Sequence, residues 1–201
     1  MLYIYGDSHG CFNFKNLPIP HENHSQFSIT MFRIGRDNMI INFDPVRHQA
    51  GSVICLAYGE VDCRCHIQRQ VNLGRNEDDV IHELVDSYFR TIRNNISKDM
   101  KIIVTGVIAP TRQVDYEVIH GPILHEFPFI GSDADRVRYT AKTNAYMEEL
   151  CKSHGYMYFN PYGYYTRDDG TLKHEMSDTI VHLGNNTYFL EQFMELYNKT
   201  I

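Results

Sequence analysis

Residues 1–10 read Met-Leu-Tyr-Ile-Tyr-Gly-Asp-Ser-His-Gly, and this stretch decides the fold. The apolar run over residues 1–5 predicts a buried strand. Gly6 permits a sharp turn after it, and Ser8 then starts the next helix. In an open parallel sheet, ligands bind beyond the carboxyl ends of the strands, so Ser8 is a candidate nucleophile. The plain alternative is that Asp7 and Ser8 only cap a helix.

Strands and helices alternate along the rest of the chain. Residues 77–97 place apolar side chains on one helical stripe behind the potential cap Asn76, with acids in the first turn. Such alternation predicts a three-layer α/β/α sandwich with a doubly wound, mainly parallel sheet of about five strands. The other expected strands are 27–34, 52–58, 101–108 and 155–159, and the other expected helices are 133–153 and 186–199.

Length and composition predict one domain over residues 1–201. Its size lets it bury a core without disulfides or a structural metal. Two segments look irregular: 109–132, which is rich in Pro and Gly and is typical of a functional loop or lid, and 160–177. No repeat or linker interrupts the sequence.

Charge and hydropathy limit the partners and the compartment. The formal net charge of −6 argues against nucleic acid as a partner. No apolar run reaches the ~20 residues that a membrane span needs, and no leader pattern precedes the first strand. The five cysteines are odd in number. We therefore expect reduced cysteines, no membrane partner and a cytoplasmic location.

A second reactive group lies near the other end of the chain. Residues 177–183 read Ser-Asp-Thr-Ile-Val-His-Leu and precede the last predicted helix. A serine hydroxyl is a weak nucleophile that needs a base, held in one tautomer by a third group. His182 and Asp178 are candidates for this base and its partner. With 11 histidines in the chain, the alternative is an ordinary histidine beside a helix cap.

Together, Gly6-Asp7-Ser8 and the Asp178/His182 pair resemble the SGNH (GDSL-type) hydrolase family. The resemblance covers nearly the whole chain and implies a flavodoxin-like sandwich. It implies Ser8 as nucleophile, His182 as general base and Asp178 as its orienting acid. The implied enzyme is a carboxylic ester hydrolase or acyltransferase that uses no cofactor and no metal. Its substrate would be a small-molecule or glycan ester, and analogy within the family suggests an acetylated carbohydrate. The sequence does not indicate an oligomeric state.

The spacing of the acid and the histidine departs from the family pattern. The family has Asp-x-x-His, whereas position 179 is Thr here and the acid lies four residues before His182. Either the loop bulges by one residue or His182 works with another partner.

The oxyanion site also departs from the family. Its third block, Gly-x-Asn-Asp, is replaced by Gly-Glu-Val-Asp-Cys-Arg at 59–64, with Val61 in the place of the oxyanion asparagine. Arg64 is the nearest strong donor. For the family's oxyanion glycine, Gly35 is the candidate after the second predicted strand, and Ser28 is a weaker one.

The charged residues of this block allow a second interpretation. Glu60, Asp62 and Arg64 line the substrate site in the esterase hypothesis, but they could equally form a structural salt-bridge network.

Two metal hypotheses compete with the esterase. Residues 6–10 also resemble the metallophosphoesterase opening Gly-Asp-x-His-Gly, with Asp7 and His9 as ligands of a two-metal site. The matching Gly-Asn-His sequence is missing, since residues 184–186 read Gly-Asn-Asn. Cys63, Cys65 and His66 offer zinc ligands, but not in a paired Cys-x-x-Cys spacing.

A catalytically inactive binding module on the same fold is the third class. The aromatic segment 156–165 could stack on a sugar face, or it could be buried packing.

Overall fold

A computed structural model describes residues 1–123 and 126–200. Within these residues, five strands form one parallel sheet in the order β2-β1-β3-β4-β5. Because β1 has β2 on one side and β3 on the other, the strand order reverses beside β1, where flavodoxin-like folds bind their ligands. The strands are β1 (Leu2–Gly6), β2 (His21–Asn23), β3 (Val53–Ala57), β4 (Lys101–Thr105) and β5 (Met157–Phe159).

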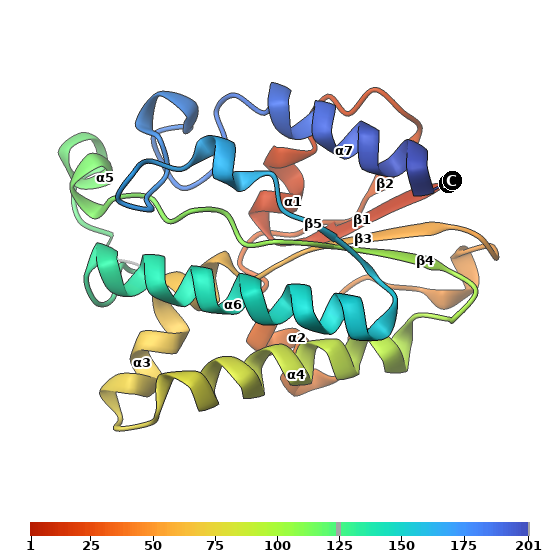
Figure 1. Cartoon of the computed structure of the whole chain (residues 1–201), viewed down its shortest axis with the longest axis horizontal. Coiled ribbons are helices and arrows are strands. Elements are labelled where there is room, and N and C mark those ends of the chain that lie inside the picture. The colour runs from red at the N-terminus through yellow and green to blue at the C-terminus, as the bar shows by residue number, and fades with distance from the viewer. Residues whose placement is uncertain (124–125, 201) are drawn as a thin grey trace.

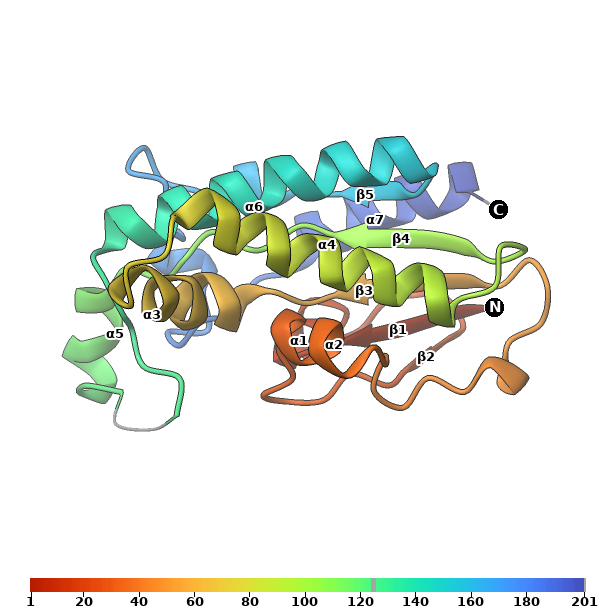
Figure 2. The same ribbon diagram turned by 90° about the horizontal axis from the view of Figure 1, so that it is seen from below.

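Helices cover both faces of the sheet, and the predicted three-layer sandwich is confirmed. Figures 1 and 2 show α1 and α7 on one face, and α2, α4 and α6 on the other. The helices are α1 (Ser8–Asn13), α2 (Met31–Asp37), α3 (Ile67–Asn72), α4 (Glu77–Asn95), α5 (Gln113–His120), α6 (Asp133–His154) and α7 (Thr187–Thr200).

The two layers of core follow from the alternation of side chains along each strand. On β1, Tyr3 and Tyr5 belong to the core beneath α2, α4 and α6. Leu2 and Ile4 point the other way, into the core beneath α1 and α7. Since both faces of β1 are buried, its sequence is continuously apolar, and this made the strand visible from the sequence.

The helix expected over 77–97 is α4. The Asn76 side chain accepts hydrogen bonds from the backbone N–H groups of Asp78 (2.8 Å) and Asp79 (3.2 Å), which begins the helix where the sequence predicted. Its apolar stripe packs into the core beneath the sheet. The helices predicted at 133–153 and 186–199 are α6 and α7, each within a residue at either end.

The strand predicted over 27–34 is wrong. Its second half forms the start of α2, and the strand that pairs with β1 is β2, on the edge of the sheet. Thr30 caps α2 by accepting from Arg33 N–H at 3.0 Å. Met31 and Ile34 then turn the apolar side of α2 into the core. The apolar side chains of this run therefore form the buried face of a helix and not a strand.

The irregular segments contain short elements. Segment 109–132 carries α5, none of whose residues is buried; residues 124–125 lie outside the described part. Segment 160–177 carries two short 3₁₀ turns. No helix within residues 1–123 or 126–200 has the length and apolarity needed to cross a bilayer. All five cysteines are free thiols.

Candidate active site

The turn after β1 holds Ser8 in a fixed place. The backbone N–H of Asp7 donates to Ala57 O of β3 (3.0 Å), and the Asp7 carboxylate caps α1 by accepting from His9 N–H (2.8 Å). A Cβ on Gly6 would lie 2.6 Å from Ala57 O and 3.1 Å from the Cα of Gly10. Only glycine fits this approach, so Gly6 brings Ser8 to the first position of α1 at the carboxyl edge of the sheet.

The turn that carries His182 accounts for the unusual spacing. Asp178 N–H donates to His182 O (2.9 Å), which closes the turn. The Asp178 carboxylate accepts from the backbone N–H groups of Ile180 (2.8 Å) and His182 (3.1 Å). Thr179 has a φ of 69°, in the left-handed region. The loop therefore bulges at Thr179, the first of the two possibilities that the sequence left open.

Ser8, His182 and Asp178 meet in one chain of hydrogen bonds. Asp178 Oδ2 lies 2.7 Å from His182 Nδ1, and Ser8 Oγ lies 2.9 Å from His182 Nε2. A carboxylate can only accept, so Nδ1 carries the proton and Nε2 accepts from the serine hydroxyl. Burial alone would raise the pKa of Asp178, but its bonds to His182 hold the pKa below the ordinary value. The group thus has the connectivity of a nucleophile, a base and an orienting acid.

An apolar flank lies beside this group. The ring of Phe12 lies 4.4 Å from that of His182, and Phe27 stacks on Phe12 at 5.7 Å. Phe27 is 61% exposed and Ile180 is 40% exposed. This flank was not predicted from the sequence, although Phe12 stands four residues after Ser8, a spacing that puts both on one side of a helix.

His9 is held between the two turns. Its Nδ1 lies 3.0 Å from Asp7 Oδ1 and its Nε2 lies 3.0 Å from Val181 O. The ring is buried, and its centroid lies 4.7 Å from that of His182. Both nitrogens are occupied, so a metal would have to displace one of these bonds. Among the residues of 1–123 and 126–200, no three His, Cys, Asp or Glu side chains gather as a metal site.

Arg64 lies in the π-helical turn η2 (Asp62–His66) and forms a buried ion pair with Glu60, two residues before this turn. Arg64 Nε and Nη2 donate to the two carboxylate oxygens of Glu60 at 2.7 and 3.1 Å, and Nη1 donates to Phe127 O. Burial would raise the pKa of Glu60, but the Arg64 charge holds it below the ordinary value. These contacts favour the salt-bridge interpretation, while the oxyanion role of Arg64 stays a prediction.

Asp62 caps a helix. Its carboxylate accepts from the backbone N–H groups of Met31 (2.7 Å) and Phe32 (3.1 Å) at the start of α2. Burial raises its pKa to about 7, although both hydrogen bonds act in the opposite direction. Asp62 therefore ties the residues after β3 to α2.

Gly35 does not follow a strand, as the sequence analysis expected, but lies inside α2. A Cβ at this position would come within 2.2 Å of Ser87 Oγ on α4, so the glycine permits two helices to pack closely. Ser28, the weaker candidate, does follow β2 and has a φ of 63°. Its neighbour Phe27 packs on Phe12, which places this loop beside the Ser8–His182 pair. Within the described residues, the backbone N–H groups of Ser8 and Ser28 have no acceptor.

The residues of the zinc hypothesis point to different neighbours. Cys63 Sγ lies 3.6 Å from Thr143 Oγ1 in the core, where burial raises the pKa of the thiol to about 12. His66 lies among aromatic rings, 5.7 Å from Phe32 and 6.0 Å from Phe127. Cys65 is buried.

The aromatic segment 156–165 serves mainly as packing. Phe159, Tyr162 and Tyr165 are buried in the core beneath α1 and α7. Tyr164 is 46% exposed and stacks on Tyr188 at 4.1 Å. Tyr164 is thus the exposed aromatic residue of the segment that the sugar-stacking alternative could use, while Tyr156 and Tyr158 are half-buried.

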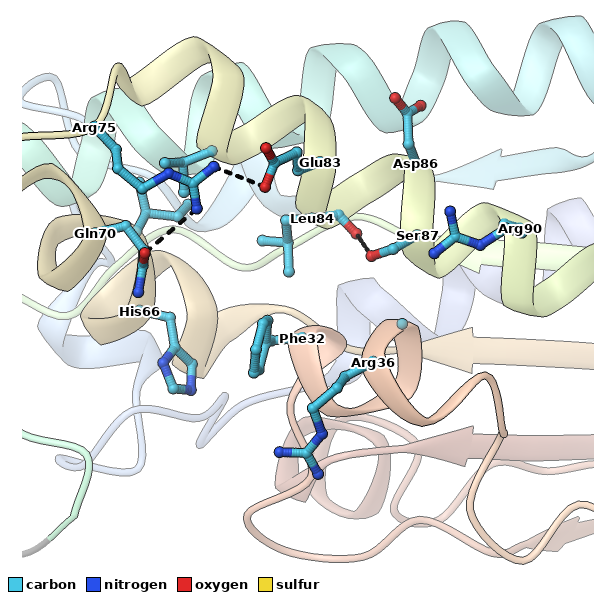
Figure 3. A pocket seen from close by; sticks show the side chains of 13 residues that line it. Phe32, Arg36, His66, Gln70, Arg75, Glu83, Leu84, Asp86, Ser87 and Arg90 are labelled. Atoms are coloured by element: carbon cyan, nitrogen blue, oxygen red, sulfur yellow. Dashed lines mark hydrogen bonds and ion pairs between the residues drawn. The ribbon is translucent and has the colours of Figure 1, made fainter.

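A cavity of about 740 Å³ lies away from these residues, between α2, α3 and α4. Figure 3 shows Phe32 and Leu84 in its wall and the Arg75–Glu83 ion pair on its rim. None of its lining residues belongs to the Ser8, His182 and Asp178 group. A small cavity of about 10 Å³ is lined by Asp7 and His9, together with Glu60 and Tyr162.

Comparison with known proteins supports the architecture. No protein-family model and no curated protein sequence matches the chain. Among solved structures, it is similar to a Streptococcus pneumonia protein provisionally described as a platelet activating factor. That match has 14% identity and a TM-score of 0.66, and it covers 100% of this chain and 83% of the other.

A GDSL-like lipase from Bacteroides thetaiotaomicron is also similar, with 16% identity and a TM-score of 0.57 over 100% of this chain and 88% of the lipase. A third similar structure, provisionally described as an acylhydrolase, comes from Bacteroides fragilis; it has 16% identity and a TM-score of 0.57 over 99% and 86% of the two chains. At these identities the likeness concerns the fold, and it establishes that this chain has the SGNH (GDSL-type) hydrolase fold.

Proposed function

We propose that the protein is a serine esterase that hydrolyses a carboxylic ester or transfers its acyl group to another hydroxyl. One observation carries the proposal: Ser8 Oγ lies 2.9 Å from His182 Nε2, whose Nδ1 lies 2.7 Å from Asp178 Oδ2. These three residues come from opposite ends of the chain and meet at the sheet edge where such folds bind ligands. That connectivity is the one a serine hydroxyl needs to become a nucleophile at neutral pH.

The reaction follows from the hydrogen bonds. Ser8 Oγ attacks the acyl carbonyl while His182 Nε2 takes its proton. The Asp178 carboxylate stabilises the imidazolium and keeps Nδ1 protonated. His182 then gives the proton to the leaving alcohol, which leaves the acyl group on Ser8. Water, or the hydroxyl of an acceptor, attacks this acyl-enzyme with His182 again as the base. No cofactor enters any step.

The oxyanion of the tetrahedral intermediate needs preorganised donors. The backbone N–H of Ser8, at the start of α1, is one candidate. The backbone N–H of Ser28 is the second, because it has no acceptor in the described part of the chain and its loop packs beside Phe12. Val61 supplies no side-chain donor, so the proposed site relies on backbone groups.

The proposed substrate is a small-molecule or glycan ester. The apolar flank of Phe12 and Phe27 suits the acyl part of such an ester, since it offers rings rather than charges beside His182. An acetylated carbohydrate fits this proposal. Rates on acetyl, butyryl and octanoyl aryl esters and on an acetylated oligosaccharide would rank the acyl and alcohol parts.

The decisive test is Ser8→Ala. The variant should lose turnover of a short-chain aryl ester by about 10⁴-fold or more, because nothing replaces the nucleophile. A serine-directed fluorophosphonate should label Ser8 in the wild-type protein and leave the variant unlabelled. Ser153→Ala is the matched control, since this serine lies exposed near the end of α6. Labelling or turnover that survives in Ser8→Ala would refute the assignment.

A second measurement separates the rival classes. Ester turnover should persist after exhaustive chelation, and added manganese should not create phosphatase activity. Phosphate release that chelation abolishes would instead support the metallophosphoesterase, with Asp7 and His9 as ligands. An intact fold with no labelling and no turnover on the ester panel would support the binding module.

A further inference from the structure

His9 joins two turns that are 172 residues apart in the sequence. On one side its Nδ1 faces Asp7 Oδ1 at 3.0 Å, in the turn that presents Ser8. On the other side its Nε2 faces Val181 O at 3.0 Å, directly before His182. The mechanism proposed above uses neither contact, yet both lie one residue from a reacting group.

Hydrogen-bond chemistry sets the protonation of this ring. A backbone carbonyl can only accept, so Nε2 must donate to Val181 O. Asp7 Oδ1 is an acceptor as well, since it already accepts from His9 N–H at 2.8 Å. Nδ1 must therefore donate as well. A neutral imidazole has one N–H, so the observed pair of contacts calls for the imidazolium form.

The charges around the ring favour this form. Burial would lower the pKa of His9, but the charge and hydrogen bond of Asp7, then Glu60 and the Val181 carbonyl, outweigh it and raise the pKa to about 9. Glu60 also forms an ion pair with Arg64. The ring centroid of His182 lies 4.7 Å from that of His9.

The second carboxylate oxygen of Asp7 also bears on the role of His9. Asp7 Oδ2 is buried and has no hydrogen-bond partner among the described residues. Asp7 is also one of the residues that line the cavity of about 10 Å³, which has room for about one water molecule. Within residues 1–123 and 126–200, the only ion pair of this carboxylate is with His9.

We propose that His9 is a positioning residue which, as an imidazolium, clamps the turn carrying His182 onto the turn carrying Ser8, so that its deprotonation sets an alkaline limit to catalysis. The catalytic part of this inference rests on the proposed esterase function. Loss of the proton leaves one nitrogen lone pair facing an oxygen, and the repulsion loosens either the Val181 or the Asp7 contact. A shift of the His182 turn by ~1 Å is enough to cost about 100-fold in rate.

The sign of the pH dependence follows from the raised pKa of His9. A group whose pKa rises on folding stabilises the fold fully below its unfolded value, ordinarily 6.5, and loses this contribution as the pH rises through about 9. The clamp should therefore be largely intact at neutral pH and open progressively as the pH rises through about 9.

The activity test is the pH profile of kcat/KM on a short-chain aryl ester. We expect a bell-shaped profile in the wild-type protein, with an alkaline limb whose apparent pKa is close to 9. His9→Gln should lower the plateau about 10–100-fold and remove the alkaline limb, since the amide has no proton to lose in this range. His174→Gln, at an exposed histidine, should keep the full profile. A wild-type profile that stays flat to pH 10.5, or an alkaline limb that persists in His9→Gln, overturns the inference.

A second test does not depend on activity or on the stability of the variant. Long-range ¹H–¹⁵N spectra of the wild-type protein at pH 7.5 should show both His9 ring nitrogens protonated, and a titration to pH 10.5 should convert one of them to a bare nitrogen. A neutral His9 at pH 7.5 in a protein that turns over esters overturns the clamp alone. A protonated His9 in a protein whose Ser8 is never labelled overturns the esterase proposal alone.

Discussion

Two charged regions follow neighbouring strands at the same edge of the sheet, and they differ in what their charges meet. Gly6 at the end of β1 pairs with Ala57 at the end of β3, so the residues after both strands begin side by side. After β1, the chain presents a serine hydroxyl to His182 and Asp178. After β3, it presents Glu60 and Arg64, which bind each other.

The difference teaches how to separate a reactive site from a structural one. The guanidinium of Arg64 donates to Glu60 and to a backbone carbonyl, and the carboxylate of Asp62 accepts from backbone N–H groups of α2. Both side chains are already satisfied by partners within the fold. Ser8 instead is half-buried, and within the described part of the chain the one side-chain hydrogen bond of its hydroxyl is to a base, His182. Charge alone therefore does not mark the chemistry; an exposed nucleophile next to a base does.

The largest expected effect on the reactive side comes from His182→Ala. It should lower kcat by about 10⁴–10⁶-fold, and the double variant with Ser8→Ala should be no slower than either single variant, because such residues act as a unit. Steady-state kinetics on one aryl ester measures this, with His174→Ala as the control. Additive losses would show that His182 does not act through Ser8.

Asp178→Asn should cost up to about 10⁴-fold in kcat/KM, because the amide no longer fixes the tautomer of His182. Far-UV circular dichroism and the same kinetics would separate misfolding from lost catalysis, and Asp168→Asn at an exposed acid is the control. If Asp178→Asn is nearly silent while His182→Ala is severe, the enzyme works as a Ser–His dyad and Asp178 only shapes the turn.

On the structural side, Arg64→Met should destabilise the fold by about 3–5 kcal/mol, because it leaves the Glu60 carboxylate buried without its partner. For a chain of this size the melting temperature should fall by about 10 °C. Adding Glu60→Gln should recover part of the loss. Arg36→Met, which removes an exposed pair with Asp37, is the control and should leave the melting temperature nearly unchanged, because solvent screens such a pair. A drop of about 100-fold in kcat without loss of melting temperature would instead make Arg64 an oxyanion donor.

Gly35→Ala should have the smallest effect, about 1–3 kcal/mol of stability with kcat unchanged, because the new methyl group meets Ser87 between two helices. Thermal unfolding and turnover would be measured on the same preparation. Gly163→Ala is the control, since a Cβ there has no heavy atom within 4 Å. A loss of kcat without loss of stability would instead show that Gly35 contributes to the active site.

The sequence determined the parts of the fold whose burial is visible in local pattern. The strand over residues 1–5 is β1 because both of its faces are covered, which requires an apolar side chain at every position. The helix behind Asn76 is α4 because a cap and a 3.6-residue stripe coincide. Ser8 and His182 were likewise identifiable, since the chemistry needs these residue types at the ends of elements.

Tertiary structure decided the rest. Residues 27–34 are rich in β-branched and aromatic side chains, but Asp62, 30 residues beyond Phe32, caps α2 and makes its first turn helical. β2 stayed invisible because an edge strand with exposed residues needs no apolar alternation. The local pattern of apolar residues indicates which faces are buried. A helix cap that comes from a distant part of the chain, such as Asp62, cannot be recognised in the sequence next to the helix.

The same holds for the candidate site. Asp178 reaches Nδ1 of His182 across four residues because the backbone of Thr179 is left-handed. A hydrogen bond from Asp178 N–H to His182 O closes this turn. The contact between His9 and Val181 O joins opposite ends of the chain. The residue types that could react were readable in the sequence. Only folding brought their atoms within hydrogen-bond distance, because such distances depend on how β1, α1 and the turn before α7 pack together.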